Sequence, residues 1–173
     1  AASSPTARNR WLDNYLSLTL SRDVRELSEI RHGALLPDLL QRLAGQTAQV
    51  LNIHNAAAAI GLEPNAAARY IALLEHVFLL YRLPAWGTTL NARSGKSPKV
   101  HVLDSAVAAR LMRLTPAKLD RREATALTEF GHLLETFVIG ELRKQASWID
   151  GVHPPGHWRT HDAAEVDFIV ERD

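Results

Sequence analysis

The stretch that decides the fold is "LNIHNAAAAIGLEPNAAARYIALLEHVFLLYRLPAW", residues 51–86. Asn52 is placed to cap a short helix over residues 53–60, because its side chain can accept a hydrogen bond from a free backbone N–H. Gly61 is expected to end that helix, and Pro64 is expected to open a second one at its first position. The β-rich run "VFLLYRLP" that follows predicts a strand. The predicted order is therefore helix, glycine turn, helix, strand.

This order is typical of a winged helix-turn-helix, which we place at residues 51–92. The residues spaced to form the buried stripe of its second helix are Ala67, Ile71 and Leu74. Asn65, Arg69 and, as a third option, Tyr70 are the exposed candidates for contacts with DNA base edges. The alanines between them suit either close approach to DNA or packing against another domain. Packing is the favoured interpretation, because winged helices are common scaffolds and a fold does not imply a function.

Upstream, residues 1–50 predict an N-terminal helical arm. Trp11, Tyr15 and Leu18 follow helical spacing, and a break is expected near residues 19–21. A short helix is expected over residues 34–47, stopped by a glycine. Its predicted apolar stripe is Leu36, Leu39, Leu40 and Leu43.

Downstream, the segment that begins at residue 87 predicts a Gly/Ser-containing loop with three basic residues, Arg93, Lys96 and Lys99. Such a loop could bind a phosphate backbone, although a solvated loop is the more common role of such a segment. The run "KVHVLD" then predicts a short buried strand. Ser105 is expected to cap a helix that ends at Leu114.

Residues 124–146 form the longest helical pattern in the chain. Its predicted buried stripe consists of Leu127, Phe130, Leu134, Phe137, Val138 and Leu142. Glu135 and Glu141 fall on or beside the same face, by the angular spacing of a helix. A buried carboxylate needs a cation, a metal, a hydrogen-bond donor or a shifted pKa, so each predicts a partner. An arginine such as Arg159 could be that partner.

The chain closes with "HWRTHDAAEVDFIVERD", residues 157–173, which predicts a turn followed by a strand. Val166, Phe168 and Val170 alternate onto the face expected to be buried. The residues expected on the other face are Glu165, Asp167, Ile169 and Glu171. Acids in line on one strand repel one another, so this face is expected either to be fully solvated or to hold a cation.

The composition excludes several classes of function. The chain of 173 residues has no cysteine, which excludes disulfides, thiolate zinc sites and cysteine nucleophiles. A net charge of +1 gives no global field toward nucleic acid or membrane. No segment resembles a secretory signal or a membrane span, so we expect a cytoplasmic location. No G-x-x-x-x-G-K-[ST] phosphate loop is present, which excludes ATP binding by that device. The single methionine, Met112, predicts that the chain is a fragment or a processed product.

Four motifs in order carry a resemblance to a known family: "SRDV" (21–24), "LLEHVFLLYRLPAW" (73–86), "KSPKVHVLDS" (96–105) and "GHLLE…EL…WRTHDAAEVDFIVE". The run resembles the domain of unknown function that follows the P-loop domain in many bacterial and archaeal AAA-type ATPases. The last motif also resembles the opening of the PD-(D/E)XK nuclease fold. That resemblance implies that Glu135 and Asp167 are the catalytic acids and ligands of Mg²⁺. The E-x-K strand of the nuclease fold is absent, which implies an incomplete site.

The expected fold class is α+β and mainly helical: a winged helix-turn-helix, then a truncated PD-(D/E)XK-like α/β unit over residues 93–173. The leading functional hypothesis is an accessory C-terminal region of an AAA-type ATPase, whose P-loop domain would be missing here, binding DNA or a partner protein. The alternatives are a metal-dependent DNA nuclease in the full-length protein, with Mg²⁺ but no cofactor in this fragment, and a purely structural interaction module. Two metal ligands sharing one ion would lie about 4–6 Å apart.

Overall fold

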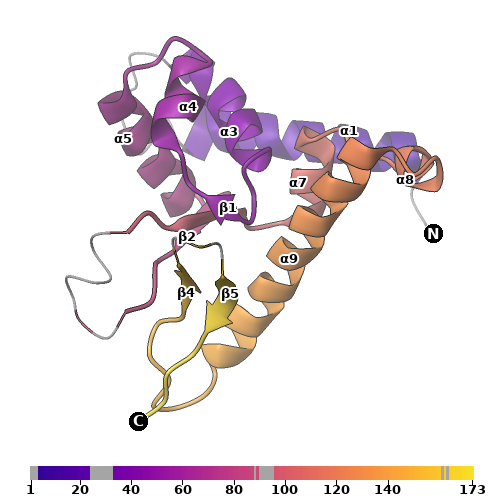
Figure 1. The fold of residues 1–173 in the computed structure, drawn as a ribbon. Helices are drawn as coiled ribbons and strands as arrows, with labels where there is room; N and C mark the ends of the chain where they lie inside the picture. The colour runs from indigo at the N-terminus through magenta and orange to yellow at the C-terminus, as the bar shows by residue number, and fades with distance from the viewer. Residues whose placement is uncertain (1–3, 24–32, 88, 90–95, 161, 163) are drawn as a thin grey trace.

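The computed structural model describes residues 4–23, 33–87, 89, 96–160, 162 and 164–173, and Figure 1 shows its mainly helical α+β arrangement. The N-terminal elements are α1 (Pro5–Leu18), a π-helical turn η1 (Thr19–Asp23), a 3₁₀ turn η2 (Gly33–Leu35), α3 (Leu36–Ala44), β1 (Gln49–Val50), α4 (Ile53–Ala58), α5 (Pro64–His76), β2 (Leu80–Leu83) and β3 (Lys99–Val102). The remaining elements are α7 (Ser105–Leu111), α8 (Pro116–Asp120), α9 (Ala124–Ala146), β4 (Gly156–Arg159) and β5 (Glu165–Ile169).

A leucine-rich core holds the N-terminal half together. The four leucines predicted as the stripe of α3 are all buried, which confirms that prediction. They pack with the buried faces of α4 and α5 in one continuous cluster that also takes in Leu12 and Leu16 of α1. Burying a leucine stabilises the fold by about 1.5–3 kcal/mol, so this cluster supplies much of the stability of the N-terminal half. The predicted break after α1 is confirmed by η1, whereas Trp11 and Leu18 lie on the exposed side of α1.

The helix–turn–helix segment forms as its sequence predicts. Asn52 accepts a hydrogen bond from the backbone N–H of Asn55 at 2.9 Å, which caps α4. Gly61 takes a φ of +66° in the turn, a conformation that strongly favours glycine. Pro64 opens α5, and the predicted stripe of that helix is buried. The exposed face of α5 therefore carries Asn65 and Arg69, whereas Tyr70 is buried, so its predicted exposure is wrong.

A three-stranded antiparallel sheet follows, in the order β1-β3-β2. The strand predicted from residue 77 starts later, because Phe78 takes a left-handed φ of +58° and lies 74% exposed. The predicted boundary near residue 92 separates β3 from the two strands with which it pairs. The cap of α7 is Asp104 rather than the predicted Ser105, since its carboxylate accepts hydrogen bonds from two backbone N–H groups at the start of the helix.

The C-terminal hairpin of β4 and β5 lies below the sheet in Figure 1, beside α9. A parallel bridge pairs Ala85 with His157, and the backbone N–H of Trp86 donates to the His157 carbonyl at 2.6 Å. A Cβ added at Gly156 would meet the Pro84 carbonyl oxygen at 3.0 Å, so only glycine fits this close approach. The hairpin is thereby joined to the chain that leaves β2.

Helix α9 has the predicted bounds, and polar contacts attach its middle to the body. The Thr136 hydroxyl lies 2.8 Å from the Thr47 hydroxyl and 3.1 Å from Nδ1 of His101. The Val102 backbone N–H donates to the same Thr47 hydroxyl at 3.1 Å. One turn away, Ile139 packs with Tyr81 and other apolar residues in a second small core. These contacts determine which face of α9 turns inward.

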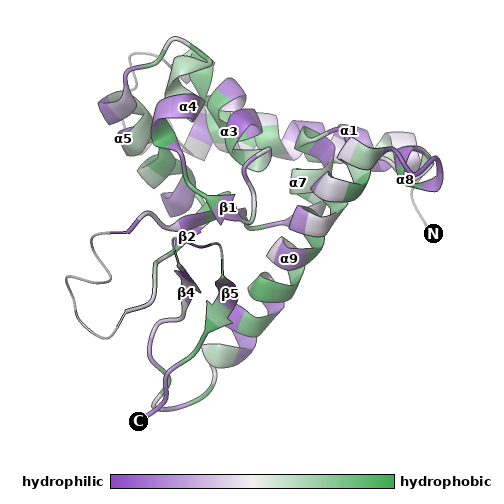
Figure 2. Ribbon diagram, viewed as in Figure 1, coloured by the Kyte–Doolittle hydropathy of each residue, from purple (hydrophilic) through white to green (hydrophobic). Residues whose placement is uncertain are grey.

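The stripe predicted to be buried on α9 is in fact exposed, because the helix turns Thr136 and Ile139 to the core instead. The exposed apolar residues are Leu127, Phe130, Leu134, Phe137, Val138 and Leu142, between 39% and 51% accessible. Val166 and Val170 are also exposed, so the predicted burial of that face of β5 is wrong except at the half-buried Phe168. Apolar segments run along α9 in Figure 2. No helix among the described residues is long and apolar enough to cross a membrane.

Stability should fall in mild acid because His101 is fully buried. Burial, reinforced by the charge of Lys99, lowers the pKa of His101 to about 3. The unfolded chain then binds a proton below about pH 6.5 that the folded chain does not, so stability is complete above that pH and is lost as the pH falls. We expect a loss of up to about 1.4 kcal/mol per pH unit from this residue.

Urea unfolding of the wild type and of His101→Asn between pH 7 and pH 5 measures this slope. Asparagine keeps a hydrogen-bonding group near Thr136 but does not titrate, so the variant should show a flatter pH dependence. His54→Asn, at an exposed position, is the matched control and should keep the wild-type slope. Equal slopes for the wild type and His101→Asn would contradict the prediction.

Candidate functional site

A buried lysine ammonium with three carboxylates around it is the most concentrated group of charges in the described structure. Lys99 is only 2% exposed. Its Nζ lies 2.8 Å from Oε1 of Glu135 and 2.7 Å from Oδ1 of Asp167, and it also forms an ion pair with Glu165. We call these four residues the lysine cluster. One positive charge therefore joins residues that are far apart in the sequence.

Three different elements bring the cluster together. The central strand β3 presents Lys99, and α9 presents Glu135 from the turn that also carries Thr136. Glu165 and Asp167 are two residues apart on β5, so strand alternation places both on one face. The predicted acidic face of this strand therefore does hold a cation, and that cation is the side chain of Lys99.

The pKa values of the cluster respond to both burial and charge. Burial alone would lower the pKa of Lys99, but hydrogen bonds to Asp167, Glu135 and Glu165 outweigh it and raise that pKa. Burial acts to raise the pKa of Asp167, yet its bond to the ammonium lowers the net value. The pKa of Glu135 is raised, because burial and the two neighbouring acids outweigh the attraction of Lys99. At neutral pH the ammonium is charged and holds the acids against their mutual repulsion.

Two neutral histidines lie in the same polar region. Burial lowers the pKa of both His101 and His157, with the charge of Lys99 as a further cause. His101 stacks on Tyr81 at 4.9 Å between ring centroids. Nε2 of His101 and Nδ1 of His157 have no hydrogen-bond partner among the described residues. The region can therefore offer hydrogen bonds as well as charge.

The predicted acids separate into two groups. Glu135 and Asp167 meet at Nζ of Lys99, so their oxygens cannot lie farther apart than the sum of those two contacts, which fits the separation of about 4–6 Å expected for shared metal ligands. Glu141 instead pairs with Lys144 on the helix surface, so its predicted burial is wrong. Arg159 approaches Glu165 at 3.9 Å rather than Glu135.

The Mg²⁺ implied by the nuclease resemblance does not fit the cluster as it is arranged. Carboxylate oxygens suit Mg²⁺, but the ammonium of Lys99 already lies at hydrogen-bond distance from Glu135 and Asp167. No group of three His, Asp or Glu residues suited to a metal ion is present in the described parts of the chain. The assignment of a metal to Glu135 and Asp167 stays a prediction.

The predicted nucleic-acid contacts come from two segments, α5 and the loop before β3. Asn65 and Arg69 are exposed and one turn apart on α5, and Lys96 is exposed in the loop before β3. Arg93 lies outside the described residues. The prediction that Lys99 contacts a phosphate backbone is wrong. Lys99 is buried in β3, and its ammonium pairs with three carboxylates.

Sequence reasoning missed the role of Lys99, although a signal was present. The run "KVHV" predicts a buried strand, and a lysine is almost never fully buried unless it is paired. A buried lysine in that strand therefore predicts nearby acids, and the acidic strand at 165–171 was the natural source. Because residues 93–99 were interpreted as a basic loop, the pairing of Lys99 with these acids was not predicted.

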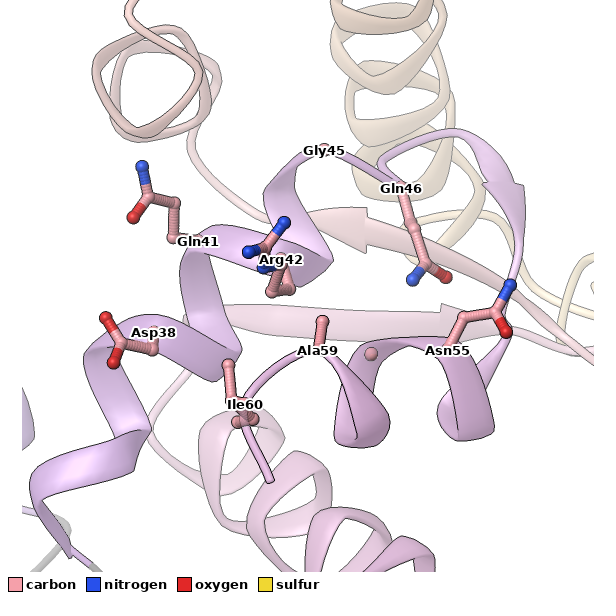
Figure 3. A pocket seen from close by; sticks show the side chains of 9 residues that line it. Asp38, Gln41, Arg42, Gly45, Gln46, Asn55, Ala59 and Ile60 are labelled. Atoms are coloured by element: carbon pink, nitrogen blue, oxygen red, sulfur yellow. The ribbon is translucent and has the colours of Figure 1, made fainter. Parts of the chain in front are cut away.

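A second polar hollow lies between α3 and α4 (Figure 3). It encloses about 690 Å³, and its lining includes Arg42, Gln46 and Asn55. Gln46 bonds through its side chain to the backbone N–H and carbonyl of Asn52, so its amide is already engaged. This hollow contains no histidine and no buried ionisable group, so the lysine cluster remains the stronger candidate site.

Comparison with known proteins finds two family matches. Residues 130–173 match the family described as Domain of unknown function (DUF4143), which is commonly found after AAA ATPase domains. Two similar proteins are the Uncharacterized protein Mb2031c of Mycobacterium bovis and the Uncharacterized protein Rv2008c of Mycobacterium tuberculosis. Each is 26% identical over 161 residues, which are 93% of this chain and 35% of the relative. The chain thus spans about a third of the length of these curated relatives. No solved structure matches.

The other match covers residues 1–118, which is more than half of the chain and includes every element from α1 to α7. It therefore also includes Lys99, whereas the three acids of the lysine cluster lie in the second matched region. This chain belongs to the family described as Domain of unknown function (DUF8612).

Proposed function

We propose that this chain is an accessory region of an AAA-type ATPase and that it binds a partner protein. The observation that carries the proposal is the row of six large apolar side chains left exposed on α9. Contiguous apolar surface of this kind on a soluble domain marks an interaction site more often than an accident of packing. The match to a family commonly found after AAA ATPase domains supports the ATPase context.

The lysine cluster supports an interaction role for α9. Glu135 and Thr136 are both attached to the body, and they lie about 100° apart around the helix. Turning α9 to bury its apolar row would break both attachments. The row is therefore held outward by polar contacts, in the orientation that a partner would need.

The N-terminal half is proposed to be a winged helix. The order α3-β1-α4-α5-β2-β3 and the sheet order β1-β3-β2 support this proposal. On its exposed side α5 carries Asn65, Arg69 and several alanines. A net charge of +1 and the loss of Lys99 from the basic set weaken a DNA role relative to a protein partner.

The partner test uses the P-loop domain of the parent protein, expressed separately and titrated with this chain. We expect the double change Leu134→Gln and Phe137→Gln to weaken association at least roughly tenfold, because two buried apolar anchors are lost. The melting temperature should stay near the wild-type value, since both side chains are half exposed. Asn65→Ala combined with Arg69→Ala on α5 is the control and should leave association unchanged.

DNA is the rival partner, and a titration at several salt concentrations separates the two. Binding that weakens with salt and with Arg69→Ala would support the DNA role, because phosphate contacts release counterions. An acidic protein of similar size serves as the control for charge alone. If DNA binds in this way and the P-loop domain does not associate, the proposed protein partner is wrong.

Removing the lysine charge should destabilise the fold. Lys99→Met leaves three carboxylates close together without their cation, and we expect a loss of about 2–4 kcal/mol in the free energy of unfolding. This range allows for the partial exposure of the acids. Lys144→Met removes only a surface pair and should change stability by less than about 1 kcal/mol. Denaturant unfolding of both variants at neutral pH measures the difference.

The second candidate function is a metal-dependent DNA nuclease in a longer protein. The convergence of Glu135 and Asp167 on one point favours it. In that case Mn²⁺ should restore the melting temperature of Lys99→Met by taking the place of the ammonium, and Asp167→Asn should remove that effect. DNA cleavage by the longer protein, lost on Asp167→Asn, would complete the case. If Mn²⁺ leaves the melting temperature of Lys99→Met unchanged, that result counts against the nuclease function.

A further inference from the structure

A pocket of about 440 Å³ opens where the C-terminal part of α9 meets the segment before β4. The residues that matter in it are Tyr81, Leu103, Gly140, Arg143, Val152 and Pro155. None of the four residues of the lysine cluster lines it. Ligand pockets typically enclose about 300–1,000 Å³, so this pocket has the size to hold a small organic molecule.

Arg143 gives the pocket an available positive charge. Its guanidinium lies over the ring of Tyr81, 4.1 Å from the ring centroid. Within the described ranges no carboxylate pairs with it, whereas the neighbouring basic side chains are engaged: Lys144 with Glu141, and His153 with Asp173. No Asp or Glu lines the pocket. An arginine held on an aromatic ring keeps its fork of donors ready for an oxyanion.

Tyr81 supplies a buried hydroxyl beside the guanidinium of Arg143. The side chain is 8% exposed, and a guanidinium can donate to the hydroxyl oxygen but cannot accept its proton, which finds no acceptor among the described residues. Leaving a buried donor without an acceptor is costly, so native proteins satisfy nearly all such groups. Burial also raises the pKa of Tyr81, which keeps its proton in place as a donor at neutral pH. A ligand oxygen that reached this hydroxyl would remove the cost.

Most of the remaining wall is apolar, and three polar residues, Lys144, Ser147 and His153, complete it. Leu103, Val152 and two prolines, Pro154 and Pro155, line the pocket around the charged end. Gly140 leaves room on the helix side, since a Cβ added there would meet no atom within 4 Å. A pocket with apolar walls and few convergent polar groups is the usual form of a small-molecule site.

We propose that this pocket binds a small organic oxyanion, a carboxylate or a phosphate attached to an apolar body. The guanidinium of Arg143 pairs with the oxyanion, and the hydroxyl of Tyr81 donates to one of its oxygens. The apolar body fills the space between Leu103, Val152 and Gly140. The site stands apart from the α9 row and does not depend on the proposed partner protein.

Calorimetric titration of the chain with four probes tests the proposal. Naphthoate and naphthyl phosphate carry the two possible oxyanions on the same apolar body, naphthamide is the neutral analogue, and inorganic phosphate lacks the body. We expect saturable binding of at least one organic anion. We expect naphthamide and inorganic phosphate to bind at least roughly tenfold more weakly, because each lacks one of the two features.

Two variants locate the binding in this pocket. Arg143→Gln should weaken the anion at least roughly tenfold by removing the paired charge. Gly140→Leu should fill the pocket and abolish binding while stabilising α9, since glycine is a poor helix former. Gly131→Leu lies in the same helix, also meets open space, and does not line the pocket, so it is the matched control with wild-type affinity.

Three outcomes would overturn the proposal. They are the absence of saturable binding by either organic anion, equal affinity for naphthamide, and full affinity in a Gly140→Leu variant that has folded. Because that variant is expected to be at least as stable as the wild type, a failure to fold does not explain its result.

Discussion

The contact of one lysine with three carboxylates is the constraint on which the arrangement of the C-terminal half depends. Lys99 belongs to the central strand of the N-terminal sheet, and its partners belong to α9 and β5. The hairpin is also attached through a short parallel bridge, and α9 through Thr136, a small apolar cluster, a hydrogen bond between His132 and Gln49 and its contacts with α7 and α8. The ammonium adds to these attachments by joining the sheet, α9 and the hairpin at one point.

The same contact changes what the acids can do. Three carboxylates around one ammonium leave a local excess of negative charge, only partly offset by the more distant Arg159. The raised pKa of Glu135 beside the lowered pKa of Asp167 expresses that imbalance. A group of this kind can stabilise a junction between two parts of a chain without any chemistry. Resemblance to a nuclease motif and a structural use of its acids are therefore compatible.

Much of the local structure could be predicted from the sequence, because it is determined by neighbouring residues. The Asn52 cap, the turn at Gly61 and the bounds of α9 all follow from short-range rules. The face that α9 buries could not be predicted, since helical periodicity identifies a stripe but not what covers it. The burial of Lys99 in a predicted strand signals that it needs acidic partners, but those partners lie at least 36 residues away, so the tertiary fold is needed to show which acids they are.

Helix α9 shows why hydrophobicity alone predicts the wrong buried face. Burying its six apolar side chains would stabilise the chain, yet the helix turns a threonine and one isoleucine inward. This orientation follows if breaking the polar attachments of Glu135 and Thr136 costs more free energy than partial burial of the apolar row would gain. The sheet and the hairpin lie on one side of α9, whose apolar row from residue 127 to residue 142 stays exposed (Figure 1). A helix attached by its polar side leaves its apolar side uncovered, which is the arrangement that the proposed partner interface requires.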